Sequence, residues 1–491
     1  MAVGFDNKKY LELQSEKIEE RIRSFGDKLY LEFGGKLFDD YHASRVLPGF
    51  EPDSKIKMLL KLKDVAEILV VISANDIEKN KYRRDLGITY DADVLRLLDV
   101  FKSKGLFVGS VVMTMYHPTA RVDGFIKRLE MLGVKVYKHY AIEGYPSDVQ
   151  KIVSEEGYGK NEYIPTSRKL VIVTAPGPGS GKMATCLSQL YHENLRGVKA
   201  GYAKFETFPI WSIPLSHPVN LAYEAATADL NDVNMIDPYH LEAYGTLAVN
   251  YNRDVEIFPV VNAMLEKILG KSPYKSPTDM GVNMAGFCIV DDEACRKASE
   301  GEIIRRYYAA LCDARKGRVS KEVVSKIELL MSKLGVTLED RKPVRPALEK
   351  AEQTGYPAVA IELPCGTVVT GKTGQLLGAA AASLLNALKL LGGIDDKMEL
   401  IPPTIIQPLQ RLKVRHMGAV NPRLHTDEVL MALAICAVES PTAKLALEQL
   451  EKLKNCEIHS TVILADVDEK TFTSLGMHVT CEPQKGTCPV V

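Results

Sequence analysis

The sequence predicts an α/β protein of two or three domains, and three observations lead to this prediction. At 491 residues, the chain exceeds the size at which a single hydrophobic core stops growing. Apolar residues make up 46% of it and charged residues 25%, which is typical of a globular protein. Over the first 230 residues or so, short apolar runs rich in β-branched residues alternate with amphipathic, helix-length segments. Such alternation requires a mostly parallel sheet with helical crossovers.

The first domain is predicted over residues 1–234 as a Rossmann-like, doubly wound parallel sheet. Strands are expected where apolar runs are short, and helices where apolar residues recur every three or four positions. The expected strands are 28–33, 67–73, 106–116, 134–140, 170–174 and 202–208, and the expected helices are 11–25, 54–62, 94–103, 121–132, 147–156, 183–195 and 219–230.

Two further domains are predicted from the change in pattern after residue 234. Strand signals thin out over 235–339, which indicates a helical subdomain, and 340–491 resumes as a smaller α/β domain after a linker at 341–346. The loop 276–283 lacks periodicity, so we favour a surface connection over a segment that closes on a ligand. The expected helices are 254–269, 292–314, 321–334, 376–391, 427–438 and 442–453, and the expected strands are 358–363, 367–370, 459–465 and 479–481.

The segment 169–193 is expected to carry the chemistry of the chain. A buried strand leads into Pro-Gly-Pro-Gly-Ser-Gly-Lys at 176–182, and a helix follows. Glycines let the backbone turn its N–H groups inward, and a helix N-terminus carries partial positive charge. This arrangement predicts a phosphate site. Its expected phosphate-binding residues are Gly177, Gly179, Ser180, Gly181 and Lys182, of which Lys182 is also considered for catalysis.

The match to the nucleotide P-loop pattern G-x-x-x-x-G-K-[ST] is imperfect. Pro176 replaces the first glycine, and Met183 replaces the Ser or Thr whose hydroxyl ligates Mg²⁺. Ser180 and Thr185 carry hydroxyls, but at other offsets. The cofactor is therefore left open: ATP or GTP with Mg²⁺ is one hypothesis, and a phosphorylated metabolite fits better if the missing hydroxyl is decisive. A tight turn without any ligand is the structural alternative.

The segment 366–373, Gly-Thr-Val-Val-Thr-Gly-Lys-Thr, fits the same pattern letter for letter. Its four interior residues are all β-branched, and such residues resist turn-like dihedrals and favour a strand. We therefore rank the inexact site above the exact one. The turn formed by Gly371, Lys372 and Thr373 is kept as a secondary anion site ahead of a helix.

A densely charged segment, 74–85, follows the predicted strand 67–73. Ligands of open α/β sheets bind outside the carboxyl ends of the strands. Cations in this segment suit phosphate, and carboxylates suit a metal or a hydroxyl group. A solvated charged loop is the alternative for any single residue. The candidates are Asp76, Lys81, Arg83, Arg84 and Asp91, of which Asp76 and Arg83 are considered for catalysis.

Three segments carry a resemblance to a known family: ISANDIEKNKYRRDLGITYDADVLRLLD, TAPGPGSGKMATCLSQLYHE and LPCGTVVTGKTGQLLGAAAASLLNALKLL. Over essentially its whole length, the chain resembles a family of bacterial cytoplasmic proteins of about this size that has no established activity. The resemblance implies a Rossmann-like domain, a helical insert and a C-terminal domain of deaminase-like topology. It implies no catalytic roles.

The deaminase-like topology raises the question of zinc. Zinc deaminases need H-x-E and then P-C-x-x-C. His240 and Glu242 form the first motif and Pro364 and Cys365 begin the second, but Val368 stands where its last Cys is required. Since one of the required zinc ligands is missing, no metal site is predicted. Cys365 is retained as a candidate nucleophile at a strand end.

Composition narrows the partners and the compartment. The chain has 62 basic and 63 acidic residues, so bulk electrostatics favours neither nucleic acid nor membrane. No run approaches the roughly 18 uncharged apolar residues of a membrane span, and nine scattered cysteines are typical of reduced thiols. We expect a cytoplasmic homo-oligomer that binds a small phosphorylated ligand. A nucleotide-dependent transferase or hydrolase is the first hypothesis, and a non-catalytic nucleotide sensor or assembly protein is the alternative.

Overall fold

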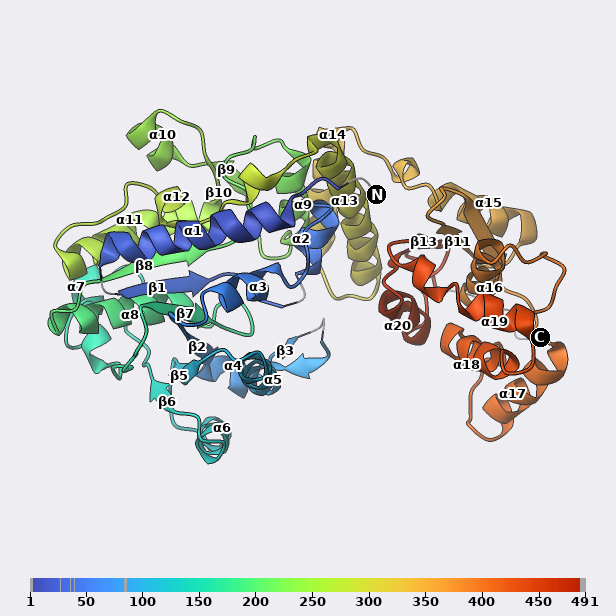
Figure 1. The fold of residues 1–491 in the computed structure, drawn as a ribbon, viewed down its shortest axis with the longest axis horizontal. Helices are drawn as coiled ribbons and strands as arrows, with labels where there is room; N and C mark the ends of the chain where they lie inside the picture. The colour runs from blue at the N-terminus through green and yellow to red at the C-terminus, as the bar shows by residue number, and fades with distance from the viewer. Residues whose placement is uncertain (1–2, 27, 36, 39, 84–85, 486–491) are drawn as a thin grey trace. The chain divides into compact units, whose positions relative to one another are not determined.

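A six-stranded parallel sheet organises the first of two units in this protein (Figure 1). The units are Met1–Ser299 and Glu300–Val491, and the second contains a smaller, four-stranded sheet. The protein is therefore a mixed α/β protein, as the alternation of strands and helices predicts. The structure, a computed structural model, describes residues 3–26, 28–35, 37–38, 40–83 and 86–485.

The first unit alternates strands and helices, and all six strands predicted for residues 1–234 are present. Its elements are α1 (Asn7–Phe25), β1 (Lys28–Phe33), α2 (Tyr41–Val46), α3 (Ser54–Lys61), β2 (Ala66–Ser73), α4 (Ala74–Glu78), β3 (Tyr82–Arg83), β4 (Ile88–Thr89), α5 (Tyr90–Ser103), β5 (Val108–Thr114), α6 (Ala120–Met131), β6 (Val136–Lys138), α7 (Val149–Ile152), the 3-10 helix η1 (Tyr158–Lys160), β7 (Leu170–Thr174), α8 (Lys182–Leu195), β8 (Ala200–Phe205), α9 (Pro218–Ala226), β9 (Asn234–Ile236), α10 (Pro238–Tyr244), β10 (Val249–Tyr251), α11 (Asn252–Leu269), α12 (Pro277–Met280), η2 (Ala285–Cys288) and the first part of α13 (Asp292–Arg315).

The strand order of the large sheet is β6-β5-β2-β7-β1-β8. All its pairings are parallel. β7 inserts between β1 and β2, since Leu170 lies opposite Leu29 on one side and Ala66 on the other. Every residue of β7 is buried. The loop that follows β7 therefore starts from the middle of the carboxyl edge of the sheet.

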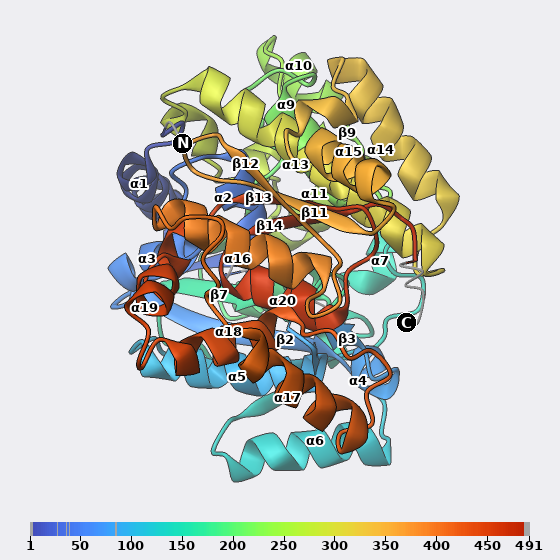
Figure 2. The same ribbon diagram turned by 90° about the vertical axis from the view of Figure 1, so that its right-hand side faces the viewer.

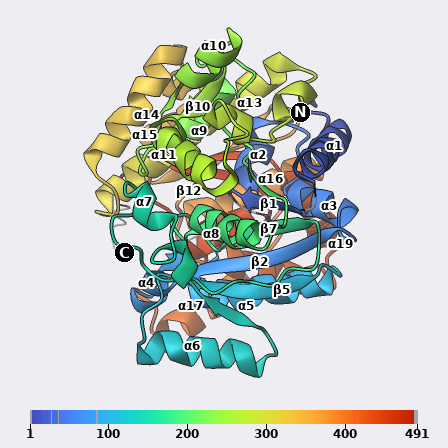
Figure 3. The same cartoon turned by 90° about the vertical axis from the view of Figure 1, so that its left-hand side faces the viewer.

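Helix α8 covers the face of the sheet around β7 (Figure 3). Its Cys186, Leu187 and Leu190 belong to one buried cluster with strand side chains. These strand residues are Leu69 and Val71 of β2 and Val171 and Val173 of β7, which alternate along each strand. Because successive side chains of a strand point to opposite faces, these alternate positions share one face. Helix α1 packs against β1 and β8 (Figure 1). The sheet is thus buried by helices that precede and follow its central strands.

The second unit packs helices against a four-stranded sheet of order β12-β11-β13-β14 (Figure 2). β13 and β14 are parallel, and the other pairings are antiparallel. Its elements are the end of α13, α14 (Lys321–Leu334), η3 (Leu338–Asp340), α15 (Val344–Thr354), β11 (Ala358–Glu362), β12 (Val368–Lys372), α16 (Ala379–Leu391), α17 (Pro403–Arg415), α18 (Thr426–Cys436), α19 (Pro441–Leu447), η4 (Leu450–Leu453), β13 (Glu457–Ser460), α20 (Asp466–Ser474) and β14 (His478–Cys481).

The boundary between the units falls at Ser299 and Glu300, inside the segment 235–339 predicted to be a helical subdomain. Helices α10, α11 and α12 belong to the first unit, whereas α14 belongs to the second. This segment also contains most of the antiparallel pair β9 and β10, which the sequence pattern did not predict. The finer division into 1–234, 235–339 and 340–491 stays a prediction.

The predicted linker at 341–346 is wrong. Arg341 is only 5% exposed, and α15 begins at Val344. Prolines suggested a linker here, but a proline in the first turn of a helix removes no intrahelical hydrogen bond. The Arg341 guanidinium donates to Glu457, to the carbonyl oxygens of Ile458 and His478 at 2.8 Å each, and to Thr480 Oγ1 at 2.9 Å.

None of the helices in the described ranges combines the length and apolar character that crossing a bilayer requires.

Most of the exact P-loop string at 366–373 is a strand, as its β-branched residues predict. Val368–Lys372 forms β12, antiparallel to β11. Gly371 lies directly under α16, where a Cβ atom would be 2.2 Å from the Ser383 backbone nitrogen. The glycine in this motif thus allows a strand and a helix to approach closely.

Replacing Gly371 with alanine is expected to destabilise the second unit by about 1–3 kcal/mol, because the methyl group would force the helix and strand apart. Urea unfolding of the variant measures the loss. Gly374→Ala is the matched control, since the nearest atom to a Cβ there is 4.0 Å away. Equal losses in the two variants would contradict this packing role.

His425 links the start of α18 to α20. Its Nδ1 lies 2.9 Å from Asp468 Oδ2, and Asp468 Oδ1 accepts from the Thr426 N–H at 2.8 Å. The hydrogen bond with Asp468 raises the pKa of His425 above its usual value. The protonated histidine is therefore the form that this contact favours.

Stability of the second unit is expected to depend on pH through this pair. Because the folded-state pKa of His425 is above its unfolded value of about 6.5, the stabilisation is fully present below that pH. It is lost as the pH rises through the folded-state pKa. The difference in unfolding free energy between wild type and His425→Gln, measured by urea titration, should therefore shrink from about pH 5.5 to about pH 8.5. His416→Gln, at an exposed position, should show no such trend.

Candidate functional site

The glycine-rich segment forms a strand, a turn and a helix: β7 ends at Thr174, and α8 begins at Lys182. Gly179 and Gly181 have positive φ angles of 75° and 89°. Side chains with a Cβ rarely adopt this conformation, so glycine is required at both positions. The chain is thereby able to leave a buried strand and enter a helix within seven residues.

Neighbouring elements hold this turn in place. The Thr114 hydroxyl at the end of β5 donates to the Ser180 carbonyl oxygen at 2.6 Å. The Ser180 hydroxyl donates to the Gly177 carbonyl oxygen at 2.8 Å, so that side chain is buried inside the turn. A Cβ atom at Gly177 would lie 2.2 Å from the Tyr90 hydroxyl, at the start of α5. Of the predicted phosphate-binding residues, Ser180 therefore offers its backbone and not its hydroxyl.

The N-terminus of α8 has no side-chain cap, because its N-cap residue is Gly181. Within the described part of the chain, no backbone carbonyl outside the helix accepts from the N–H groups of Lys182, Met183 or Ala184. Free amides at the start of a helix carry the positive end of its dipole. This 14-residue helix thus begins with donors that an anion would satisfy.

The topology of the sheet places this turn at a change of direction. The chain runs outward from β2 to β5 and β6, whereas it runs from β7 past β1 to β8 on the other side. β2 and β7 are neighbours, so their following connections diverge. In open α/β proteins, ligands bind outside the carboxyl ends of the strands at such a switch point.

The charged segment after β2 lies beside the same turn. Lys81 Nζ lies 3.2 Å from Asp76 Oδ1, 3.5 Å from the Pro178 carbonyl oxygen and 4.9 Å from the centre of the Tyr90 ring. Two candidates of the charged segment, Lys81 and Asp76, thus lie beside the glycine turn, at the carboxyl edge where they are expected. Burial raises the pKa of Tyr90.

The remaining candidates of this segment are placed differently. Arg83 binds Asp93 of α5 at 2.8 Å, and Arg96 binds the same buried carboxylate at 2.7 Å. Arg83 therefore stabilises the start of α5. Asp91 is half-buried in the first turn of that helix, and Arg84 lies outside the described residues.

The candidates of the second unit lie around its hairpin. Cys365 is exposed in the connection between β11 and β12, with its Sγ 3.3 Å from the Thr367 hydroxyl, and this contact lowers the pKa of the thiol. Thr373 uses its N–H to donate to the Pro357 carbonyl oxygen at 2.9 Å, and Lys372 is exposed. Since α16 begins only at Ala379, the secondary anion site at Gly371–Thr373 stays a prediction.

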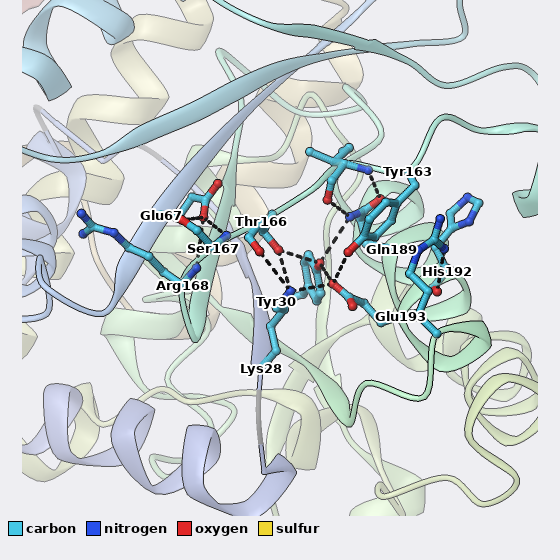
Figure 4. Close-up of polar contacts among 12 residues, drawn as sticks. Lys28, Tyr30, Glu67, Tyr163, Thr166, Ser167, Arg168, Gln189, His192 and Glu193 are labelled. Atoms are coloured by element: carbon cyan, nitrogen blue, oxygen red, sulfur yellow. Dashed lines mark hydrogen bonds and ion pairs between the residues drawn. The ribbon is translucent and has the colours of Figure 1, made fainter.

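Sequence reasoning missed a polar cluster at the opposite, amino edge of the large sheet (Figure 4). Glu193, fully buried at the end of α8, accepts from Lys28 Nζ at 2.8 Å and from the Tyr30 hydroxyl at 2.7 Å. Tyr30 also accepts from Gln189 at 3.3 Å. The cluster ties the end of α8 to β1, so its role is to hold the helix against the sheet.

No group of three or more His, Cys, Asp or Glu side chains is arranged to hold a metal ion in the ranges that the structure describes.

Comparison with known proteins identifies the family. A family model described as "Domain of unknown function DUF1846, N-terminal" matches residues 3–335, and its C-terminal counterpart matches residues 339–487. The chain belongs to the DUF1846 family. It is 58% identical over 481 residues to UPF0371 proteins of Streptococcus pyogenes serotype M5, Streptococcus sanguinis and Streptococcus uberis. In each case the match covers 98% of this chain and 97% of the relative. The resemblance inferred from the three sequence segments is therefore confirmed.

In this DUF1846 chain, Thr114→Val is expected to destabilise the first unit by about 1–3 kcal/mol, because it leaves the buried Ser180 carbonyl without its donor. The unfolding free energy from urea titration measures the loss. Ser103→Ala, which removes an exposed hydroxyl, should change it by less than about 0.5 kcal/mol. A Thr114→Val variant as stable as wild type would show that the turn does not need this bond.

Proposed function

We propose that the first unit is a Rossmann-like, doubly wound domain that binds a small phosphorylated ligand at the turn 177–182. The observation that supports it is the uncapped start of α8 at the switch point of the sheet. At Gly179, where φ is positive, no atom lies within 4 Å of the position that a Cβ would take, so this part of the turn is open to close approach. The ligand would accept hydrogen bonds from the N–H groups that have no acceptor at the start of α8.

Electrostatics favours an anion at this position. The helix dipole contributes about half an elementary charge at its N-terminus, and the Lys182 ammonium contributes a full one. Lys81 lies across the turn, although Asp76 balances its charge. Phosphate combines three acceptor oxygens with negative charge, so it satisfies backbone amides and lysine together.

A phosphorylated metabolite suits the turn better than a magnesium nucleotide. Met183 replaces the Mg²⁺-ligating hydroxyl, and the two nearby hydroxyls are buried. Ser180 donates to the Gly177 carbonyl oxygen, and Thr185 donates to the Gly181 carbonyl oxygen at 3.0 Å. ATP or GTP with Mg²⁺ is the second candidate ligand.

An enzyme acting on this ligand, by phosphoryl transfer or by chemistry that depends on a nucleotide, is the favoured activity. In such reactions, positioning and charge neutralisation do most of the catalysis. A non-catalytic nucleotide sensor or assembly protein is the alternative. The burial of both hydroxyls near the turn favours this alternative, because it leaves fewer groups for proton transfer. Turnover assays with a bound ligand separate the two.

The proposal extends to the rest of the molecule. The second unit is proposed to have a deaminase-like arrangement without zinc ligands, as the family resemblance implies. The protein is proposed to act in the cytoplasm as a homo-oligomer. Its formal charge of −1 supports a small-molecule partner over nucleic acid or an anionic membrane.

Lys182→Ala is expected to weaken the binding of inorganic phosphate and of mononucleotides by about tenfold to 100-fold, because one charged hydrogen bond is lost. A ligand is first identified by thermal unfolding in the presence of a panel of nucleotides and sugar phosphates. A ligand at a concentration of 100 times its Kd should stabilise the fold by about 2.7 kcal/mol. Titration calorimetry then compares the variants.

Lys199→Ala is the matched control, because Lys199 is exposed just before β8, at the amino edge of the same sheet. It should bind as wild type does. Unchanged affinity in Lys182→Ala, or a panel with no stabilisation at generous concentrations, would contradict the proposal.

A further inference from the structure

A second charged cluster lies at the carboxyl end of β8, and none of the predicted sites includes it. Lys204 Nζ donates to Asp254 Oδ1 at 2.7 Å and Oδ2 at 2.6 Å, and to the Tyr251 hydroxyl oxygen at 2.6 Å. It also lies 3.2 Å from Glu206 Oε1. Tyr251 in turn donates to Glu206. One ammonium group is thus shared by two carboxylates and a phenol.

Among the residues that the structure describes, the charge of this cluster is unbalanced. Glu32, a third carboxylate and itself buried, accepts from the Tyr202 hydroxyl at 2.7 Å and interacts electrostatically with both Lys204 and Glu206. Arg253 is paired with Asp232 at 2.6 Å. In the described part of the chain, three carboxylates therefore interact with one ammonium group, and buried charge of one sign is costly unless it is matched.

The directions of the pKa shifts in the cluster agree with this excess of negative charge. Burial raises the pKa of Glu206, and the neighbouring Asp254 raises it further, although Lys204 opposes the shift. Burial alone would lower the pKa of Lys204, but the surrounding carboxylates raise it well above its usual value. The cluster thus favours added positive charge.

A cavity of about 50 Å³ opens onto these groups. The side chains of Lys204 and Asp254 are each 15% exposed and that of Glu206 is 25% exposed, so the charges reach the cavity. Phe208 and Trp211 form part of its wall. At roughly 10–15 Å³ for each water-sized group, the cavity has room for about three to five of them.

We propose that this cavity binds the primary ammonium group of a small amine. The carboxylates of Glu206 and Asp254 would accept its N–H groups, and the aromatic wall suits an organic cation, because aromatic faces attract ammonium ions. A divalent metal ion is not favoured, since no metal-binding group occurs among the described residues.

The loop 276–283 completes this site. Val282 N–H donates to the Lys204 carbonyl oxygen at 3.0 Å, and Thr278 and Asn283 line the cavity. The sequence pattern favoured a plain surface connection for this loop. Its contacts with β8 instead support the alternative, a segment that borders a ligand. The site is built from residues other than those of the glycine turn, so it stands independently of the proposed function.

The test uses methylammonium chloride as the probe on the full chain. Carboxyl-carbon NMR of protein labelled at glutamate and aspartate side chains should show a saturable shift at Glu206 and Asp254. Affinity should fall at least tenfold in Glu206→Gln and in Asp254→Asn. Glu256→Gln, at an exposed position on α11, is the matched control and should bind within twofold of wild type.

Three control titrations show what causes an NMR shift at Glu206 and Asp254. Sodium chloride and magnesium chloride at equal ionic strength test for binding of any cation, and methanol tests for binding of a neutral analogue. Equal shifts with sodium would mean an adventitious cation only and would overturn the proposal. So would unchanged binding in Glu206→Gln. If that variant does not fold, the absence of a saturable shift in wild type overturns it equally. Lys182→Ala should leave methylammonium binding unchanged, which separates this site from the phosphate site.

Discussion

The turn between β7 and α8 is the constraint on which the first unit depends. A strand buried on both faces must lead directly into a helix that covers one of those faces, so the backbone reverses within seven residues. Positive φ at Gly179 and Gly181 makes the reversal possible, and the hydrogen bond from Thr114 fixes it. The same geometry leaves the first amides of α8 without partners. The packing requirement and the proposed anion site therefore have one physical origin.

Buried charge has different roles at the two edges of the large sheet. At the amino edge, Lys28 and Glu193 balance each other and tie α8 to β1, which is a structural role. At the carboxyl edge, Lys204 faces an excess of carboxylates beside a cavity. Balanced buried pairs hold elements together, whereas an unmatched buried charge is costly. Both proposed sites lie at the carboxyl edge, where parallel α/β proteins bind their ligands.

The two P-loop-like strings show that backbone physics outweighs a match of letters. Four β-branched residues favour a strand in the exact string, and Gly371 allows α16 to pack closely against that strand. The inexact string has three glycines and no β-branched residue in its turn, so it bends. What identifies a phosphate turn is therefore its allowed dihedral angles and the helix that follows it.

The sequence by itself determined the alternation of strands and helices and the strands of the large sheet, because strand and helix periodicity and glycine conformation are local properties. It placed the six strands of the large sheet and named Lys81 and Asp76 as candidates at its carboxyl edge. It could not order the strands, bury Arg341 or assemble Lys204 with Asp254, since these depend on pairings between residues about 50 to 140 positions apart. Such contacts form only when the sheet closes, so only the tertiary structure decided where the charges gather.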